Sequence, residues 1–376
     1  MKKIKVLHLT SSPRGIGGVE RLLLDMAGKY DASTFDVGHC NLFCADLGTG
    51  EFSQALKDTG ARYFEIKGRK WFELPRILFR LITLLRAERF DVLHLHMLHA
   101  TILGGFAAIF VPKTKVVVTR HYTVALVNKP LLKWLDIFFT KRADRVAAIS
   151  DYVKRDLMKN GVNPEAISIV HNGTDIDAFD RAAGDADFPR KEKAFLMGTV
   201  GSLTHRKGHE HLIRALPLIL RENPACELVV VGEGPELPHL QALSTELRLE
   251  NKIRFAGFRK DIPQILRSFD LYVHPSLFEP FGIAILEAMA ARKCVVATAV
   301  EGVTEIVVDG KTGHLVPPAD ADRLAEAINE AISDAGRLSR SGEEGRKRVE
   351  ENFSIAKTVS GYQRLYVEVA DCSSIN

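Results

Sequence analysis

Short apolar runs rich in valine and isoleucine alternate with longer stretches of helical periodicity along most of the chain. In the first half, the runs that predict strands are Ile4–Leu9, Phe35–Leu42, Val92–His96, Lys115–Thr119, Val146–Ile149 and Ile167–Val170. Helical patterns lie between them, as in Val19–Lys29, Pro75–Glu88 and Leu131–Lys141. Strands that are apolar throughout are typical of buried parallel sheets. The alternation therefore predicts a doubly wound α/β sheet.

The pattern stops at residues 180–193, which are polar, charged and without periodicity, as in a linker. It resumes with strands predicted at Ala194–Gly201, Glu227–Gly232, Lys252–Phe255, Leu271–His274 and Val295–Thr298. A chain of 376 residues is longer than a domain with a single hydrophobic core usually is. We therefore expect two Rossmann-like parallel-sheet domains, residues 1–183 and 194–354, facing across a cleft. A final helix, Ile355–Ala370, is compatible with either domain, so residues 355–376 can cross back to the first.

The composition is that of a globular protein, and it argues against some classes of partner. A net charge of only +4 argues against nucleic acid as the main partner. The cysteines are odd in number and form no CxxC pair, which favours a reduced, cytoplasmic protein; they are Cys40, Cys44, Cys226, Cys294 and Cys372. The apolar stretch at the N-terminus has the length of a strand rather than of a signal peptide. The most apolar run, Ala100 to Val111, is shorter than the roughly 20 residues that span a bilayer.

Glycines follow the first predicted strand and precede a helix that begins near Val19. Gly15, Gly17 and Gly18 let backbone amides approach a ligand closely, and the helix N-terminus favours phosphate. The alternative is a flexible connection. The spacing cannot supply GxGxxG, which counts against an NAD-dependent oxidoreductase.

A basic pair follows the first strand of the second predicted domain. Gly201 makes a turn, and Arg206 and Lys207 then lead into a helix. Two cations at a strand end, beside a helix N-terminus, suit a diphosphate. Such cations act on the transition state, because charge grows on a diphosphate leaving group as the bond to it breaks. A solvated basic turn is an equal alternative on these residues alone.

An acidic pair follows the strand Leu271–His274. Glu279 lies in the loop, and Glu287 lies about one turn inside the next helix, eight positions later. A loop carboxylate can face a reacting sugar, and a helix carboxylate can accept hydrogen bonds from a vicinal diol such as a ribose. Free amides at Gly282 and Ile283 can donate to sugar hydroxyls or phosphate. An exposed Glu287 is the alternative, but its apolar neighbours predict a mostly buried helix.

These residues carry a family resemblance. The segment EPFGIAILEAMA, from Glu279, resembles the signature of retaining glycosyltransferases of family GT4, which have the two-domain GT-B fold. Further matching segments follow in order: GGVE from Gly17, DVLHLH from Asp91, AISDYVKRDL from Ala148, HNGTD from His171, VGEGP from Val231, and GVTEIVVDGKTGHLVPPAD from Gly302. The resemblance covers nearly the whole chain, and the order and spacing of its segments are highly specific.

The resemblance implies roles for individual residues. Glu279 contacts the donor sugar near the reacting centre, Glu287 holds the ribose hydroxyls, and Lys207 binds phosphate. Where the family often has arginine after the strand-ending glycine, this chain has Ser202, and Arg206 is the candidate replacement. His121, directly after the strand Lys115–Thr119, resembles the family histidine that hydrogen-bonds the donor sugar; a surface histidine is the alternative. The first domain is then the acceptor domain and the second the nucleotide-sugar domain.

Two patterns raise the question of a metal. His94 and His96 share one face of a strand with His99 nearby. No cysteine or carboxylate stands at ligand spacing beside them, and the family has no catalytic metal, so we expect none. DxD-like strings occur at Asp175–Asp177, Asp185–Asp187 and Asp320–Asp322. We assign them to the HNGTD loop, the linker and a helix N-cap, respectively.

Residues 67–89 are basic and aromatic, as in segments that lie on anionic membranes. Their cations are Lys67, Arg69, Lys70, Arg76, Arg80, Arg86 and Arg89, against only Glu73 and Glu88. An ordinary helix with a basic outer face is the alternative. Lipid-linked acceptors are common in the family, so a peripheral position on the inner face of the plasma membrane is compatible with the sequence.

The sequence therefore predicts a metal-independent retaining glycosyltransferase. It would move a hexose or N-acetylhexosamine from a UDP- or GDP-sugar, which is a substrate and not a cofactor, to a cell-envelope glycan or lipid-linked acceptor. Two alternatives remain: a nucleotide-sugar epimerase on the same fold, and a catalytically silent nucleotide-sugar-binding protein. The pair of glutamates with Lys207 disfavours the silent protein.

Overall fold

The computed structural model describes residues 2–11, 17–44, 51–68, 73–182, 184 and 194–371. The chain forms two compact units: unit 1 comprises Met1–Asn172 with Ile355–Asn376, and unit 2 comprises Gly173–Ser354. Helix α7 (Ile176–Arg181) belongs to unit 2, whereas the sequence analysis assigned residues up to 183 to the first domain. Most of the predicted linker lies outside the described residues.

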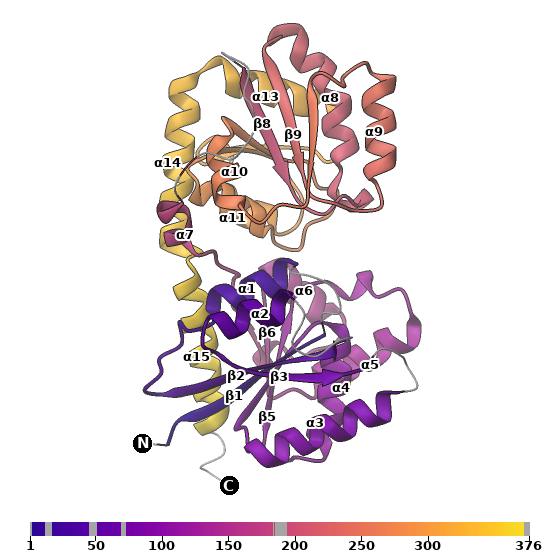
Figure 1. The fold of residues 1–376 in the computed structure, drawn as a ribbon, viewed down its shortest axis with the longest axis vertical. Helices are drawn as coiled ribbons and strands as arrows, with labels where there is room; N and C mark the ends of the chain where they lie inside the picture. Colours follow the sequence, from indigo (N-terminus) through magenta and orange to yellow (C-terminus); the bar gives the residue numbers. More distant parts are fainter. Residues whose placement is uncertain are drawn as a thin grey trace. The chain divides into compact units, whose positions relative to one another are not determined.

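Unit 1 is built on a seven-stranded parallel sheet in the order β3-β2-β1-β4-β5-β6-β7 (Figure 1). Its strands are β1 (Ile4–Thr10), β2 (Phe35–Cys44), β3 (Arg62–Lys67), β4 (Val92–His96), β5 (Lys115–Arg120), β6 (Arg145–Ala148) and β7 (Ile167–Ile169). Its helices are α1 (Gly18–Met26), α2 (Glu51–Asp58), α3 (Leu74–Glu88), α4 (Leu98–Ile109), α5 (Pro130–Lys141), α6 (Asp151–Lys159) and α15 (Ile355–Asp371). Short 3-10 turns lie at Val124–Leu126 and Pro164–Ala166.

Unit 2 has a six-stranded parallel sheet in the order β10-β9-β8-β11-β12-β13. Its strands are β8 (Phe195–Val200), β9 (Cys226–Val231), β10 (Ile253–Gly257), β11 (Leu271–His274), β12 (Cys294–Thr298) and β13 (Gly313–Val316). Its other helices are η4 (His205–Lys207), α8 (His209–Glu222), α9 (Leu237–Glu246), α10 (Ile262–Ser268), α11 (Ile283–Ala290), α12 (Val303–Ile306), α13 (Ala321–Ser333) and α14 (Ala335–Asn352).

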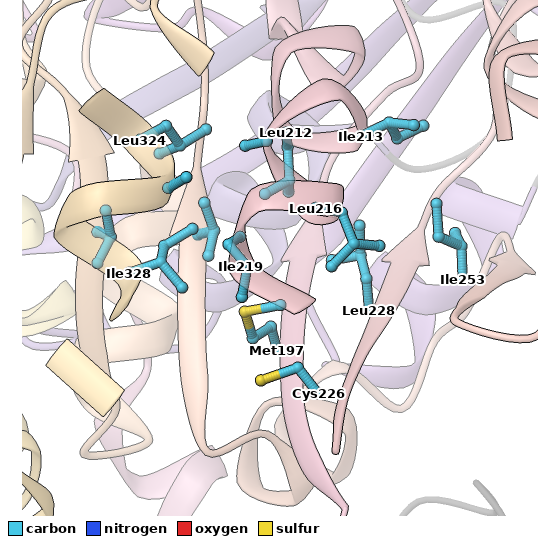
Figure 2. Close-up of a cluster of buried hydrophobic side chains, with 14 of the residues drawn as sticks. Met197, Leu212, Ile213, Leu216, Ile219, Cys226, Leu228, Ile253, Leu324 and Ile328 are labelled. Atoms are coloured by element: carbon cyan, nitrogen blue, oxygen red, sulfur yellow. The ribbon is translucent and has the colours of Figure 1, made fainter. Parts of the chain in front are cut away.

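Each unit has apolar cores between its sheet and its helices. In unit 1, the side chains of Leu7 and Leu93 face α3 and α4, whereas those of Val6 and Val92 face α1 and α15. Because successive side chains of a strand point to opposite faces, both faces of the sheet are covered. In unit 2, Figure 2 shows Leu212, Leu216 and Ile219 of α8 packed over Met197 and Leu228 of the sheet.

The two strands that the sequence analysis missed lie at sheet edges or carry a weak pattern. β3 ends the first sheet, and its residues from Arg62 to Glu65 are only partly buried. β13 is an edge strand of four residues that begins with Gly313. Edge strands bury less apolar surface, so their sequences lack the continuous hydrophobic run of a central parallel strand.

No helix of the described residues is long and apolar enough to cross a membrane.

Candidate active site

The basic pair of unit 2 lies in a tight turn fixed against the end of β11. β8 ends at Val200, and the chain then passes through η4 before α8 begins. Gly208 has a φ of +64°, and a Cβ added there would lie 2.1 Å from the Pro275 carbonyl oxygen. The Leu277 amide donates to the Arg206 carbonyl at 2.8 Å. Only glycine permits this approach, so the turn that carries Lys207 is held beside the loop that carries Glu279.

Lys207 and Glu279 form an ion pair at the carboxyl ends of β8 and β11. Their side chains are 14% and 9% exposed. The Nε2 atom of His274 lies 3.2 Å from the same Oε2 of Glu279, and Ser276 Oγ lies 3.0 Å from His274 Nε2. The structure thus brings together two residues that stand 72 positions apart in the sequence.

The electrostatics of this group keep Glu279 ionised. Burial by itself would raise the pKa of Glu279, but Lys207 and His274 outweigh it and hold that pKa well below its usual range. Burial lowers the pKa of His274, so its ring is neutral at pH 7. A neutral ring that donates from Nε2 to Glu279 leaves Nδ1 to accept from Tyr272, whose hydroxyl oxygen is 3.2 Å away.

Sequence reasoning missed the residues that fix the Glu279 loop. Its backbone amide donates to Glu301 at 3.1 Å, and its carbonyl accepts from the Gly302 amide at 3.1 Å. A Cβ at Gly302 would lie 2.2 Å from the Pro280 carbonyl oxygen. The available signal was a glycine in the loop four residues after β12, because a loop glycine is typical of a close backbone approach.

Glu287, Gly282 and Ile283 lie on the helix that follows. Gly282 precedes α11 with a φ of +119°, and Ile283 is the first residue of the helix. The first amides of a helix have no intrahelical acceptor, so this end can donate to a ligand. Glu287 is partly exposed, whereas its neighbours Leu286 and Ala288 are buried. The side chain of Glu287 is therefore only partly covered by its neighbours.

Arg206, Ser202 and Gly201 are the other candidates of the basic turn. Arg206 is partly exposed and, among the residues that the structure describes, forms no ion pair. Ser202 is exposed. Gly201 lies against Lys207: a Cβ on it would lie 3.8 Å from the Lys207 Cε, an ordinary contact.

Unit 1 carries the other candidates at the ends of its own strands. Gly17 and Gly18 are exposed at the start of α1, whereas Gly15 lies outside the described residues. The Gly17 amide donates to the Glu20 carboxylate at 3.0 Å, so this donor is occupied by the protein itself. His121 directly follows β5, and its Nε2 lies 3.0 Å from Nδ1 of His96.

The histidines do form a compact group, but with different members from those named by the sequence. The ligand nitrogens of His8, His94 and His96 all lie within 4.8 Å of one another. His99 lies against Phe43 instead, with ring centroids 5.8 Å apart. His8 Nδ1 is hydrogen-bonded to His96 Nε2 at 2.9 Å, so two candidate ligand atoms are already bonded to each other.

The DxD-like strings have other partners where they are described. Asp320 caps α13 by accepting from the Arg323 amide at 2.9 Å, which confirms the N-cap prediction. Asp175 lies 3.6 Å from Arg181. The string at residues 185–187 lies outside the described residues.

Comparison with known proteins identifies the family. The model of glycosyl transferases group 1 matches residues 180–348, and that of glycosyltransferase family 4 matches residues 16–178. The alpha-maltose-1-phosphate synthase of Mycolicibacterium smegmatis is 30% identical over 76% of this chain and 80% of its own length. The chain belongs to glycosyltransferase family 4. It is a retaining glycosyltransferase of the hexosyltransferase class.

Two further matches of this glycosyltransferase extend over nearly its whole length. The UDP-Gal:alpha-D-GlcNAc-diphosphoundecaprenol alpha-1,3-galactosyltransferase of Escherichia coli is 28% identical over 98% of this chain and 97% of its own. The crystal structure of Anabaena Alr3699/HepE in complex with UDP and glucose matches with a TM-score of 0.82 and 25% identity, over 98% and 100% of the chains. The two parallel Rossmann-like sheets are those of the GT-B fold, as predicted.

Proposed function

We propose that this glycosyltransferase moves a hexose or N-acetylhexosamine from a UDP-sugar to a lipid-linked glycan of the cell envelope. The observation that carries the proposal is the buried Lys207–Glu279 pair at the strand ends of unit 2. Relatives support the substrate class, because one transfers galactose to a diphosphoundecaprenol-linked acceptor and a structural neighbour binds UDP-glucose.

In the proposed mechanism, Lys207 neutralises the diphosphate leaving group, with Arg206 as a second cation. Glu279, kept ionised, contacts the donor sugar near the reacting carbon, and His121 hydrogen-bonds the same sugar. Glu287 accepts hydrogen bonds from the ribose hydroxyls, while Gly201, Gly282 and Ile283 offer backbone close to the donor. Gly18, with Gly17, offers a second helix N-terminus. Fixed charges of this kind stabilise charge that develops only in the transition state.

A donor screen followed by a transfer assay tests the proposal. Calorimetry against UDP-, GDP- and ADP-sugars should give the strongest binding for a UDP-sugar. Incubation of that donor with a synthetic polyprenyl-diphosphate-linked sugar should give one new glycoside with the anomeric configuration of the donor, read by NMR. Isomerised donor without glycoside would indicate an epimerase. Binding with neither transfer nor donor hydrolysis would indicate a silent binding protein.

Glu287→Ala should weaken donor binding more than turnover. The hydrogen bonds that it removes involve a charged group, so we expect a loss of about 1.5–3 kcal/mol in donor binding free energy. Calorimetric titration of the UDP-sugar measures it, with Glu326→Ala on the exposed face of α13 as the matched control. Donor affinity equal to that of the unaltered protein would remove Glu287 from the site.

Transfer activity should survive EDTA. Cationic side chains and helix N-termini take the place of a metal beside the diphosphate. Initial rates with and without the chelator, and after addition of Mg²⁺ or Mn²⁺, test this expectation. Abolition by EDTA with recovery on addition of metal would contradict it.

A surface of unit 1 supports a membrane-bound acceptor. Helix α3 packs against α4, and α4 packs against α5 (Figure 1). Phe79 on α3 is 70% exposed, Ile109 on α4 is 61% exposed and Trp134 on α5 is 60% exposed. Exposed cations accompany them, namely Arg76, Arg80, Arg86, Lys129, Lys133, Lys141 and Arg142. We call this surface the α3–α5 face.

The α3–α5 face has the chemistry of a peripheral membrane contact. The acidic residue of α5, Asp136, is buried and pairs with Arg120 at 2.6 Å, so it does not offset the exposed cations. Exposed aromatic groups among cations suit the boundary of an anionic bilayer. Residues 69–72 of the predicted membrane segment lie outside the described residues. The proposed location is therefore cytoplasmic, peripheral on the inner face of the plasma membrane.

Replacing Phe79 and Trp134 with serine should lower binding to anionic vesicles by at least about tenfold. Burial of one large apolar side chain contributes about 1.5–3 kcal/mol, and each tenfold in affinity corresponds to about 1.4 kcal/mol. Vesicle flotation measures the binding, and Phe258→Ser in unit 2, where the side chain is 49% exposed, is the matched control. Equal flotation of both variants would contradict a contact through this face.

A further inference from the structure

A chain of buried imidazoles lies behind His121 in unit 1. His8 of β1, His39 of β2 and His94 of β4 are directly paired in the sheet register, and His96 follows on the same face of β4. All four side chains are at most 2% exposed. Burial lowers the pKa of each ring, and also that of His121, so the rings are neutral at pH 7.

Three of these rings are hydrogen-bonded in series. His121 Nε2 lies 3.0 Å from His96 Nδ1, and His96 Nε2 lies 2.9 Å from His8 Nδ1. His8 Nε2 lies 3.1 Å from the Tyr30 hydroxyl and 3.2 Å from that of Tyr366. The series thus runs from the end of β5 to two phenols in the core.

The tautomers along this series depend on one another. A neutral imidazole has one N–H donor and one acceptor nitrogen. If His8 accepts at Nε2, it must donate from Nδ1 to His96, and His96 must donate from its own Nδ1 to His121. His121 then carries its proton on Nδ1. If His8 donates from Nε2 instead, every ring reverses, and His121 Nδ1 carries no proton.

A side branch restricts which way the phenols donate. Tyr366 Oη lies 2.6 Å from His94 Nδ1, and His94 Nε2 lies 2.6 Å from Thr119 Oγ1. Thr119 Oγ1 in turn donates to the Tyr362 hydroxyl at 3.3 Å. His94 then donates from Nε2 to Thr119 and accepts at Nδ1. The proton of Tyr366 therefore goes to His94.

Tyr30 then supplies the proton to His8. Burial raises the pKa of Tyr30, so its hydroxyl keeps its proton. Its possible acceptors are His8 Nε2 at 3.1 Å, the sulfur of Met26 at 3.8 Å and the hydroxyl oxygen of Tyr366. An imidazole nitrogen is a stronger acceptor than a thioether or a phenol oxygen. This difference favours donation from Tyr30 to His8.

We propose that His8 and His96 are positioning residues that hold His121 as its Nδ1–H tautomer, so that Nδ1 donates to a hydroxyl oxygen of the donor sugar. His121 Nδ1 is buried and has no hydrogen-bond partner among the residues that the structure describes. A donor without a protein partner at that atom is what a ligand oxygen would complete. The sugar contact rests on the proposed function, whereas the tautomer does not.

The tautomer is measured first, on the full-length ligand-free protein. Nitrogen-15 NMR of labelled histidine should show His121 protonated at Nδ1. The double variant Tyr30→Phe with Tyr366→Phe keeps both rings but removes both phenol donors, so the Nδ1–H signal of His121 should decrease. Tyr362→Phe is the matched control, because it loses one buried hydroxyl of the same core without touching His8. His121 protonated at Nε2 in the unaltered protein would overturn the proposal.

Kinetics then separate the tautomer from the sugar contact. The double variant should lower kcat/KM about two- to tenfold, the range for one neutral hydrogen bond, and Tyr362→Phe should not. In a His121→Ala background the phenol substitutions should have no further effect. Full activity of His121→Ala would refute the sugar contact while the NMR result stands. An equal loss in Tyr362→Phe, or one zinc ion per chain that is lost in a His94→Phe variant, would overturn the positioning role.

Discussion

Lys207→Ala should lower turnover by a factor of about ten to a thousand, the scale found when one fixed transition-state donor is removed. Negative charge grows on the diphosphate only as the sugar departs. A cation held beside the leaving group by the Gly208 turn therefore acts more on the transition state than on the bound donor. Donor affinity should change much less than kcat.

Lys207→Ala also breaks the ion pair with Glu279, so the loss of stability must be separated from the loss of catalysis. Loss of Lys207 leaves a buried carboxylate with the neutral ring of His274, 3.2 Å away, as its nearest partner among the described residues. A buried charge without an opposite charge is strongly destabilising. A variant with Glu279→Gln in addition should recover the thermal stability of the protein but not its turnover. Lys347→Ala, an exposed lysine of unit 2, is the control for initial rates. Unchanged turnover in Lys207→Ala would refute the role.

Arg206 tests the departure from the family pattern at Ser202. If Arg206 replaces the missing arginine, Arg206→Ala should lower turnover on the same scale as Lys207→Ala, and adding Ser202→Arg should partly restore it. The structure leaves the Arg206 side chain without an ion pair among the described residues, so a diphosphate would be its first strong partner. Activity close to that of the unaltered protein would make Arg206 a solvated turn residue.

The sequence predicted the fold well because parallel strands with both faces covered are continuous apolar runs. Val92–His96 and Leu271–His274 were predicted with the bounds that the structure has. The pair of Lys207 and Glu279 was predicted only as two separate signals, since nothing local indicates that two strand ends are neighbours in the sheet. The carboxyl ends of β8 and β11 meet because the strand order places them side by side.

The buried histidine group could not be predicted from the sequence. His94 and His96 were noticed because they alternate within one strand, but His8 and His39 stand on other strands as single residues. Only the register that pairs His8 with both His39 and His94 shows a shared core. Two hydroxyls complete the group. Tyr30 lies in the segment after α1, and Tyr366 lies on α15. No spacing rule connects positions so far apart.

These buried histidines predict that unit 1 unfolds in mild acid. Burial lowers the pKa of His39 to about 4 and that of His121 to about 3, whereas an unfolded histidine titrates near 6.5. Between those values the unfolded chain binds protons that the folded unit does not, so stability is full above pH 6.5 and falls as the pH decreases. Each such ring contributes a slope of about 1.4 kcal/mol per pH unit.

Two rings alone would remove about 3 kcal/mol per pH unit, and burial also lowers the pKa values of His8, His94 and His96. Domains are stable by only about 5–15 kcal/mol, so unit 1 should unfold within roughly two to three pH units below 6.5. Hydrogen exchange of β1 and β4 peptides at pH 4.5, 5.5 and 7.5 measures it. In His39→Phe, stability should fall less steeply with decreasing pH, by the slope that corresponds to about one proton, because a ring that does not titrate replaces a buried ring that does. His239→Phe at an exposed site should not change the slope. Protection of β1 that is equal at all three pH values would contradict the prediction, because it would mean that the folded and unfolded states bind equal numbers of protons.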